Sequence, residues 1–129
     1  MKILVVDDEP DVQFLFQQKF RKELRNHQVE FAFALSGEAA LDYLQGHENE
    51  VVLILSDINM PGMTGLELLK QIKQKHYTPP PTVMMITAYG DQQNHDQAMQ
   101  LGADDFLTKP LDFNLLKQKL KIGEETLPG

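Results

Sequence analysis

VVLILSD, residues 51–57, decides the fold, because it is an almost continuous apolar run that ends in a carboxylate. A second run, TVMMI at residues 82–86, is equally apolar and ends at Thr87. Short continuous runs of this kind are typical of strands that are covered on both faces, as in parallel sheets. A buried carboxylate without a partner is costly, so Asp57 requires either a partner or a role. The stretch therefore predicts a central strand that delivers a functional carboxylate.

Five short apolar segments alternate with helical patterns along the chain. We expect strands at residues 2–6, 29–34, 51–56, 82–86 and 105–108. Apolar side chains at three- and four-residue spacing predict helices at residues 10–25, 37–45, 65–75, 91–101 and 112–122. Strands that alternate with helices form right-handed βαβ units and a parallel sheet. The predicted fold class is therefore α/β, with helices on both faces of one sheet.

Several residues mark where these helices begin and end. Ser36 is placed to cap the helix at 37–45, and Thr64 and Glu67 have the spacing of a capping box before the next helix. Gly102 is a suitable left-handed stop for the helix at 91–101. Residues 76–81 contain three successive prolines, which predict a stiff, extended connection.

Composition excludes several classes of protein. The chain has 129 residues, enough for one domain, and its net charge of -7 argues against direct nucleic-acid binding. No apolar run approaches the ~20 residues of a membrane span, and the acidic start MKILVVDDEP is not a signal peptide. The absence of cysteine excludes disulfides and fits a cytoplasmic protein. The histidines show no metal-ligand spacing, so we expect surface positions for His27, His47, His76 and His95.

Polar residues stand at the ends of four predicted strands. Asp7 and Asp8 follow the first strand, Asp57 the third, Thr87 the fourth and Lys109 the fifth. In an open parallel sheet, ligands bind in the crevice beyond the carboxyl ends of the strands. Three carboxylates, a hydroxyl and an ammonium at one place suit a divalent cation and a phosphoryl group, with one carboxylate free to act as nucleophile.

Each of these residues also has a plainer interpretation. An acidic pair before a helix can simply be favourable charge at the helix N-terminus. Thr87 alone is more often an ordinary strand residue, and Lys109 before Pro110 can be an exposed turn residue. These interpretations would all have to hold at once, at matching strand ends, and we reject them jointly.

Taken together, the residues resemble the receiver domain of bacterial two-component response regulators. The resemblance is carried by VVDDEP at 5–10, SDINMPGMTG at 56–65, ITAYG at 86–90 and FLTKP at 106–110. It implies a flavodoxin-like (βα)5 sandwich with the strand order 2-1-3-4-5. It covers residues 1–122 and leaves residues 123–129 as a polar tail or the start of a linker.

The resemblance also implies a role for each site residue. Asp57 would be the phosphoacceptor, and Asp7, Asp8 and the backbone carbonyl of Asn59 would bind Mg²⁺, or Mn²⁺ in its place, together with it. Phe106 has the position of an aromatic switch, although without the resemblance a core aromatic is an equally good interpretation. The remaining residues would bind the phosphoryl group or follow it: Thr87, Ala88 and Lys109, with a cis peptide bond before Pro110.

The implied function is a phosphorylation-activated signalling switch rather than an enzyme with a turnover substrate. A sensor histidine kinase or a histidine phosphotransfer protein would donate the phosphoryl group. The response would alter the face formed by residues 91–101, 105–108 and 112–122, which an unknown output domain or effector would contact; a phosphorylation-dependent dimer is compatible with this. Two alternatives stay open. A haloacid-dehalogenase-type phosphatase would have its nucleophile in a D-x-D arrangement after the first strand, and a constitutive interaction module would not need intact Asp8, Asp57 and Lys109.

Overall fold

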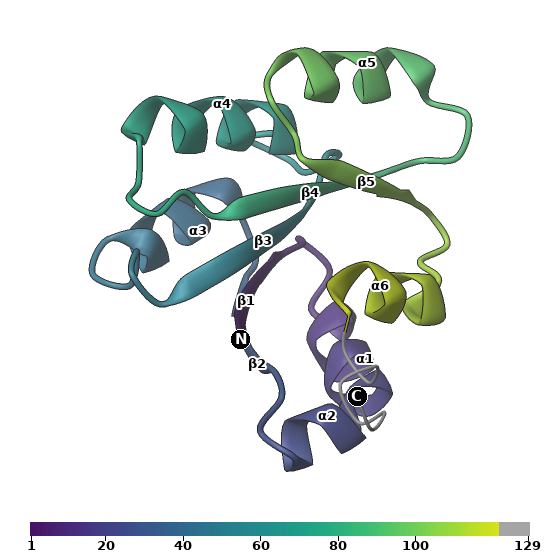
Figure 1. Cartoon of the computed structure of the whole chain (residues 1–129). Helices are drawn as coiled ribbons and strands as arrows, with labels where there is room; N and C mark the ends of the chain where they lie inside the picture. Colours follow the sequence, from purple (N-terminus) through teal and green to yellow (C-terminus); the bar gives the residue numbers. More distant parts are fainter. Residues whose placement is uncertain (122–129) are drawn as a thin grey trace.

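A five-stranded parallel sheet forms the centre of the computed structural model, which describes residues 1–121 (Figure 1). The strands lie in the order β2-β1-β3-β4-β5, which confirms the predicted order and fold class. Strands β3 and β4 each extend one residue further than expected, and β2 begins one residue later. The strands are β1 (Lys2–Val6), β2 (Glu30–Ala34), β3 (Val51–Asp57), β4 (Thr82–Thr87) and β5 (Asp105–Thr108).

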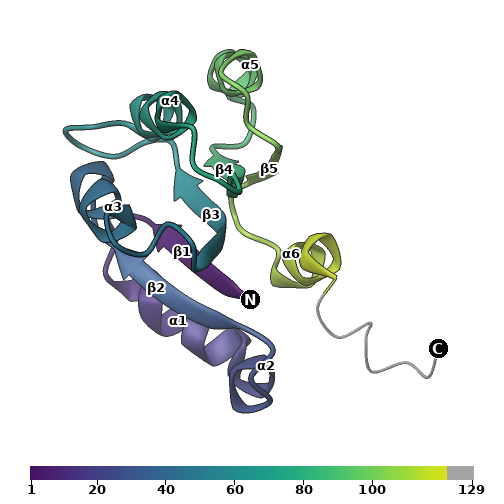
Figure 2. The same cartoon turned by 60° about the vertical axis from the view of Figure 1, so that its left-hand side comes forward.

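Helices cover both faces of this sheet, as Figures 1 and 2 show from two directions. One face carries α3 (Gly37–Leu44), α4 (Gly65–Lys75) and α5 (Gln92–Gln100). The opposite face carries α1 (Asp11–Lys19), α2 (Arg21–Arg25) and α6 (Phe113–Leu120). The result is a three-layer sandwich in which the three central strands, β1, β3 and β4, are the most deeply covered.

The two faces of the sheet have separate hydrophobic cores, because successive side chains of a strand point to opposite faces. The core under α3, α4 and α5 includes Leu4, Ile54, Leu68, Ile72 and Met85. The core under α1, α2 and α6 includes Ile3, Val5, Leu55, Phe16, Phe20 and Leu116. A group of phenylalanine rings fills the second core, with Phe16 and Phe113 edge to face at 5.1 Å between ring centroids.

The predicted helix ends are largely confirmed. The Ser36 hydroxyl accepts a hydrogen bond from the Ala39 N–H at 3.0 Å, and Thr64 and Glu67 form the complete capping box. Gly102, with φ +97°, takes the left-handed conformation expected after α5. The capping box of Thr64 and Glu67 thus fixes the start of α4 at Gly65, shortly after Asp57.

A single helix over residues 10–25 is a wrong prediction. Helix α1 ends at Lys19 and α2 begins at Arg21, because Phe20 leaves helical geometry with φ −105° and ψ 21°. Phe20 is fully buried and its ring lies parallel to that of Phe16 at 5.9 Å. Because Phe20 and Leu24 still pack against the core across the break, the apolar periodicity continues and does not reveal it.

Other expectations concern connections and ends. Residues 76–81 contain no helix or strand, as expected, and the Thr78–Pro79 peptide bond is cis. The predicted domain boundary at residue 122 and the tail at 123–129 lie outside the described residues. Among residues 1–121, no helix has the length and apolar character required to cross a membrane.

Candidate functional site

The predicted site residues meet at the carboxyl ends of the strands. The register places Asp57, the last residue of β3, beside Ile86 of β4, so that Thr87 is the next residue along. The Lys109 backbone N–H donates to the Thr87 carbonyl oxygen at 2.8 Å, which fixes the end of β5 against β4. Asp7 follows β1, the other neighbour of β3. Four strands therefore deliver their polar residues to one edge of the sheet.

Asp57 is completely buried, and both of its carboxylate oxygens have partners. Its Oδ2 accepts a hydrogen bond from Lys109 Nζ at 2.8 Å, and its Oδ1 accepts one from the Asn59 backbone N–H at 3.1 Å. Burial lowers the pKa of Lys109, but the hydrogen bond to Asp57 and the negative charges of Asp57, Asp7 and Glu9 outweigh it, so that its pKa is raised. Lys109 is therefore a firmly charged partner for the buried carboxylate.

Three carboxylates converge around this position. Asp7, Asp8 and Asp57 each offer an oxygen, and these oxygens lie within 4.8 Å of one another. Burial and the charge of Asp57 raise the pKa of Asp7, although the hydrogen bond from the Glu9 N–H to Asp7 Oδ1, at 2.9 Å, opposes this. An oxygen-only donor set of this kind, with its charges crowded together, fits Mg²⁺, or Mn²⁺ with the same ligands.

Asn59, in the loop after β3, and Thr87, at the end of β4, take different positions beside the acids. Asn59 is exposed, and its N–H orients the Asp57 carboxylate; the expected use of its backbone carbonyl as a metal ligand stays a prediction. Thr87 is almost fully buried, with 2% of its surface exposed. Thr87 and the half-buried Ala88 line a small cavity of about 70 Å³ together with Thr108 and His95.

The structure confirms the cis peptide bond between Lys109 and Pro110. Phe106 is half-buried and packs at the border of the core under α3, α4 and α5. The imidazole of His95 lies against its ring, with 3.6 Å between ring centroids. The prediction of surface positions for all the histidines is therefore partly wrong: His27 and His76 are exposed, but His47 and His95 are half-buried against aromatic rings.

Gly65, the first residue of α4, is a site residue that the sequence analysis missed. A Cβ atom at this position would lie 2.2 Å from the Asp57 carbonyl oxygen and 2.7 Å from Ile58 Cα. The Gly65 N–H donates to the Ile58 carbonyl oxygen at 2.8 Å. The start of α4 thus packs directly on the backbone that carries Asp57. The available signal was a glycine immediately after the cap residue Thr64, where helix formation alone does not call for one.

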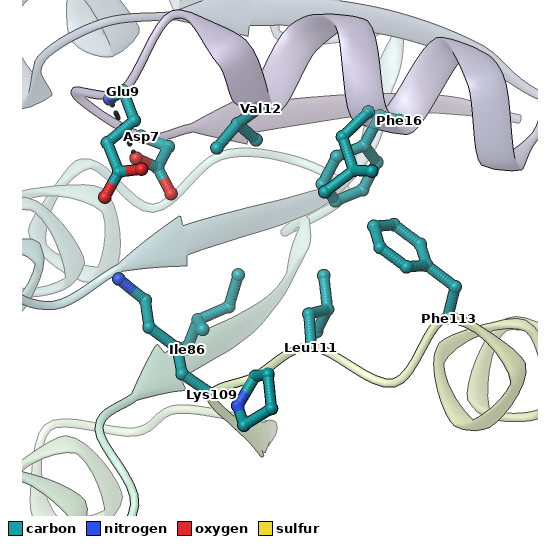
Figure 3. Close-up of a pocket in the computed structure, with 10 residues that line it drawn as sticks. Asp7, Glu9, Val12, Phe16, Ile86, Lys109, Leu111 and Phe113 are labelled. Atoms are coloured by element: carbon teal, nitrogen blue, oxygen red, sulfur yellow. Dashed lines mark hydrogen bonds between the residues drawn. The ribbon is translucent and has the colours of Figure 1, made fainter.

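A cavity of about 500 Å³ opens beside the acidic cluster, between α1 and the segment that connects β5 to α6 (Figure 3). Figure 3 shows Asp7, Glu9 and Lys109 at one end of it, and the rings of Phe16 and Phe113 at the other. Val12, Ile86 and Leu111 lie between these two ends. The apolar spacing in residues 10–25 predicts a helix, but it does not show that part of the apolar stripe lines an open cavity.

Comparison with known proteins gives a consistent result. The family model of the response regulator receiver domain matches residues 3–121. The response regulator RppA of Synechocystis is 32% identical over 128 residues, which cover 99% of this chain and 52% of that protein. The chain spans about half the length of several curated relatives that it matches.

Solved structures agree with the family model. A response regulator receiver domain protein from Clostridium thermocellum has a TM-score of 0.80 and 28% identity, covering 97% of this chain and 96% of that one. A second similar structure is the complex of the Saccharomyces cerevisiae histidine phosphotransfer protein Ypd1 with the receiver domain of the response regulator Ssk1. Its TM-score is 0.80 at 25% identity, with 94% of this chain and 86% of that chain covered.

Proposed function

Because this chain belongs to the response regulator receiver domain family, we propose that it is a phosphorylation-controlled switch with Asp57 as its phosphoacceptor. The observation that carries the proposal is the surroundings of Asp57. A fully buried carboxylate at a strand end is held by Lys109 Nζ at 2.8 Å, beside two further carboxylates. A set of groups that only stabilised the fold would not need three carboxylates with oxygens within 4.8 Å.

We assign the metal site to the carboxylates of Asp7, Asp8 and Asp57 and to the backbone carbonyl of Asn59. Bound there, Mg²⁺ or Mn²⁺ would neutralise the carboxylates and the incoming phosphoryl oxygens. The chain itself supplies the orientation, since the Glu9 and Asn59 N–H groups each hold one carboxylate oxygen of Asp7 and Asp57 respectively. Mutual repulsion of these acids is what a divalent cation would relieve.

The transfer itself is a displacement at phosphorus. A carboxylate oxygen of Asp57 forms a bond to the phosphorus atom, the bond from phosphorus to a histidine nitrogen of the donor breaks, and the electron pair stays on the imidazole. Lys109 Nζ then turns from the carboxylate to the phosphoryl oxygens as a compact positive charge. The Thr87 hydroxyl and the Ala88 N–H supply further donors. Water later hydrolyses the acyl phosphate, so the chain modifies itself and has no turnover substrate.

The donor is a sensor histidine kinase or a histidine phosphotransfer protein. The similar Ssk1 receiver domain was solved with a histidine phosphotransfer protein, which supports this assignment. We place the donor on the cavity between α1 and the segment from β5 to α6, because its apolar wall begins at Asp7 and Lys109 (Figure 3). Leu15 of α1, which is 38% exposed, adds to the apolar lining of this cavity.

The response would be read on the α5–β5–α6 face by an output domain, an effector or a second copy of the chain. We assign the domain to residues 1–122, and residues 123–129 to a tail or the start of a linker. The proposed donors and the absence of cysteine both fit a cytoplasmic location. The acidic net charge of -7 argues against direct binding of nucleic acid by this domain.

Mass spectrometry after treatment with acetyl phosphate and Mg²⁺ tests the proposal. We expect a gain of about 80 Da, one phosphoryl group, in the wild type and in Asp42→Asn, which alters an exposed carboxylate on α3. Asp57→Asn should fold but gain nothing. A full gain in Asp57→Asn would refute the phosphoacceptor. Continuous release of phosphate would indicate a phosphatase, and no gain in any variant would indicate a constitutive interaction module.

A further inference from the structure

His95 on α5 makes a ring contact that the proposed function does not use. Its imidazole lies against Phe106 of β5, with 3.6 Å between ring centroids and 38° between ring planes. The same imidazole lines the small cavity of about 70 Å³ beside Thr87 and Thr108. His95 is therefore shared by the contact that holds the Phe106 ring and by the wall of the space next to Thr87.

Side chains of α5 hold this imidazole in place. Nδ1 of His95 lies 3.4 Å from Asp96 Oδ1, and Gln92 Nε2 donates to that same oxygen at 2.8 Å. The hydrogen bond from Gln92, and then His95, lower the pKa of Asp96, so that its carboxylate is charged. His95 thus has a negative charge on one side and an aromatic ring on the other.

Among the described residues, the lining of the small cavity beside His95 contains one acidic side chain. Asp91, at the N-terminus of α5, lines the same cavity, where its carboxylate caps Asn94. The neighbouring strands contribute Phe106, Thr87 and Thr108, none of which carries a charge. The charge nearest to Phe106 along β5, Asp105, is paired with Lys119 of α6 at 2.8 Å.

We propose that His95 is a positioning residue that holds Phe106 in its resting place, and that protonation of its imidazole tightens this hold. The inference rests on the proposed function, because the position of Phe106 matters only if phosphorylation at Asp57 draws Thr87 and then Phe106 inward. A cation over an aromatic face attracts it, and a protonated imidazole also pairs with Asp96. Histidine is the side chain that gains this charge between about pH 8 and pH 5.

The consequence is a response that depends on pH. A positive charge on His95 favours the resting arrangement, so phosphorylation must then overcome a larger free-energy difference to displace Phe106. A ligand shifts such an equilibrium only by its differential affinity for the two arrangements. The apparent affinity for a phosphate mimic therefore reports how strongly His95 holds the ring.

The test is NMR titration with beryllofluoride in saturating Mg²⁺ at pH 6 and pH 8, using the wild type, His95→Gln and His95→Arg. From pH 8 to pH 6, the wild-type Kd should rise about two- to five-fold more than that of His95→Gln, the factor that corresponds to ~0.5–1 kcal/mol for an exposed cation–aromatic contact. His95→Arg, a permanent planar cation, should bind weakly at both pH values without the additional dependence. Titration of the carboxylates is common to all variants and cancels in the comparison.

His47→Gln is the matched control, because His47 also stacks on an aromatic ring, that of Tyr43, at 4.1 Å but does not touch Phe106. It should behave as the wild type. The inference would be overturned if the Kd had the same pH dependence in wild type and His95→Gln, or if substitution of His95 left the Phe106 ring resonances unchanged. Either result would leave Asp57 phosphorylation intact. Failure of every variant to respond to beryllofluoride would instead refute the proposed function, and this inference with it.

Discussion

Gly65→Ala is the perturbation that tests most directly how Asp57 is positioned. The added Cβ would lie 2.2 Å from the Asp57 carbonyl oxygen, whereas ordinary van der Waals contact begins at 3.4 Å. The three atoms nearest to this Cβ all belong to the backbone of Asp57 or Ile58, so rotation of a side chain cannot relieve the contact. Either the first turn of α4 or the end of β3 has to move by roughly 1 Å.

Two effects of this displacement can be estimated. Overpacking that forces a backbone shift typically costs about 1–3 kcal/mol, and we expect the upper half of that range because only backbone can yield. A misplacement of ~1 Å in a reacting group lowers rates on the order of 100-fold. We therefore expect Gly65→Ala to lose about 2–3 kcal/mol of unfolding free energy and to be phosphorylated about 100-fold more slowly.

Urea unfolding gives the first quantity, and the rate of mass gain with acetyl phosphate and Mg²⁺ gives the second. Gly37→Ala is the matched control, because Gly37 also follows a capping residue, Ser36, as the first residue of its helix. There the three atoms nearest to the Cβ all belong to the side chain of Met63, with Sδ at 2.7 Å, and that flexible side chain can move. Wild-type phosphorylation in a folded Gly65→Ala protein would refute the link between α4 and Asp57.

Three further predictions concern the acids and the switch. In metal-free buffer, Asp7→Asn should raise the free energy of unfolding at pH 7. Burial and the charge of Asp57 raise the pKa of Asp7, so the folded chain binds that proton more tightly than the unfolded chain does. The ionised Asp7 side chain therefore destabilises the folded state as pH rises. Urea titrations should show this gain shrinking toward about pH 4, and a gain that grows there would contradict the sign. Asp8→Ala should weaken Mg²⁺ binding at neutral pH by calorimetry, and an unchanged affinity would remove Asp8 from the site. Thr87→Ala should still accept phosphate but lose the beryllofluoride-induced NMR shifts around Phe106 and α5; an equal response would disprove the relay.

The sequence was sufficient for the features that depend on local pattern and strand ends. Apolar runs predicted the strands, and the spacing of Thr64 and Glu67 predicted the start of α4. The convergence of Asp7, Asp57 and Lys109 followed from one topological rule, that parallel strands bring their carboxyl ends to the same edge. Lys109 was expected at the same edge as a ligand of the phosphoryl group, and the structure adds a direct contact, with Lys109 Nζ 2.8 Å from Asp57 Oδ2.

The features that were missed depend on tertiary contact. The break at Phe20 has no signature, because both sides of it continue the same apolar stripe. Gly65 is required because the backbone at the end of β3 lies very close to it. The residue pattern of a helix does not show how closely a strand approaches. His95 was expected at the surface because the histidines show no metal-ligand spacing, but its ring partner, Phe106, belongs to β5, the next strand along the chain. No periodicity within one helix reports such a neighbour.

The separation of the two hydrophobic cores has a consequence for how such a protein can change over evolutionary time. The cavity proposed to receive the phosphodonor is built on the core under α1, α2 and α6, whereas Phe106 and α5 belong to the opposite core. The sheet separates α1 and α2 from Phe106 and α5, whereas α6 borders the cavity and also belongs to the proposed response face. A duplicated copy can therefore acquire a new phosphodonor through substitutions on α1 while it keeps the output partner that contacts α5, or the reverse. Engineers can use the same division to rewire the input of this domain and its output one at a time.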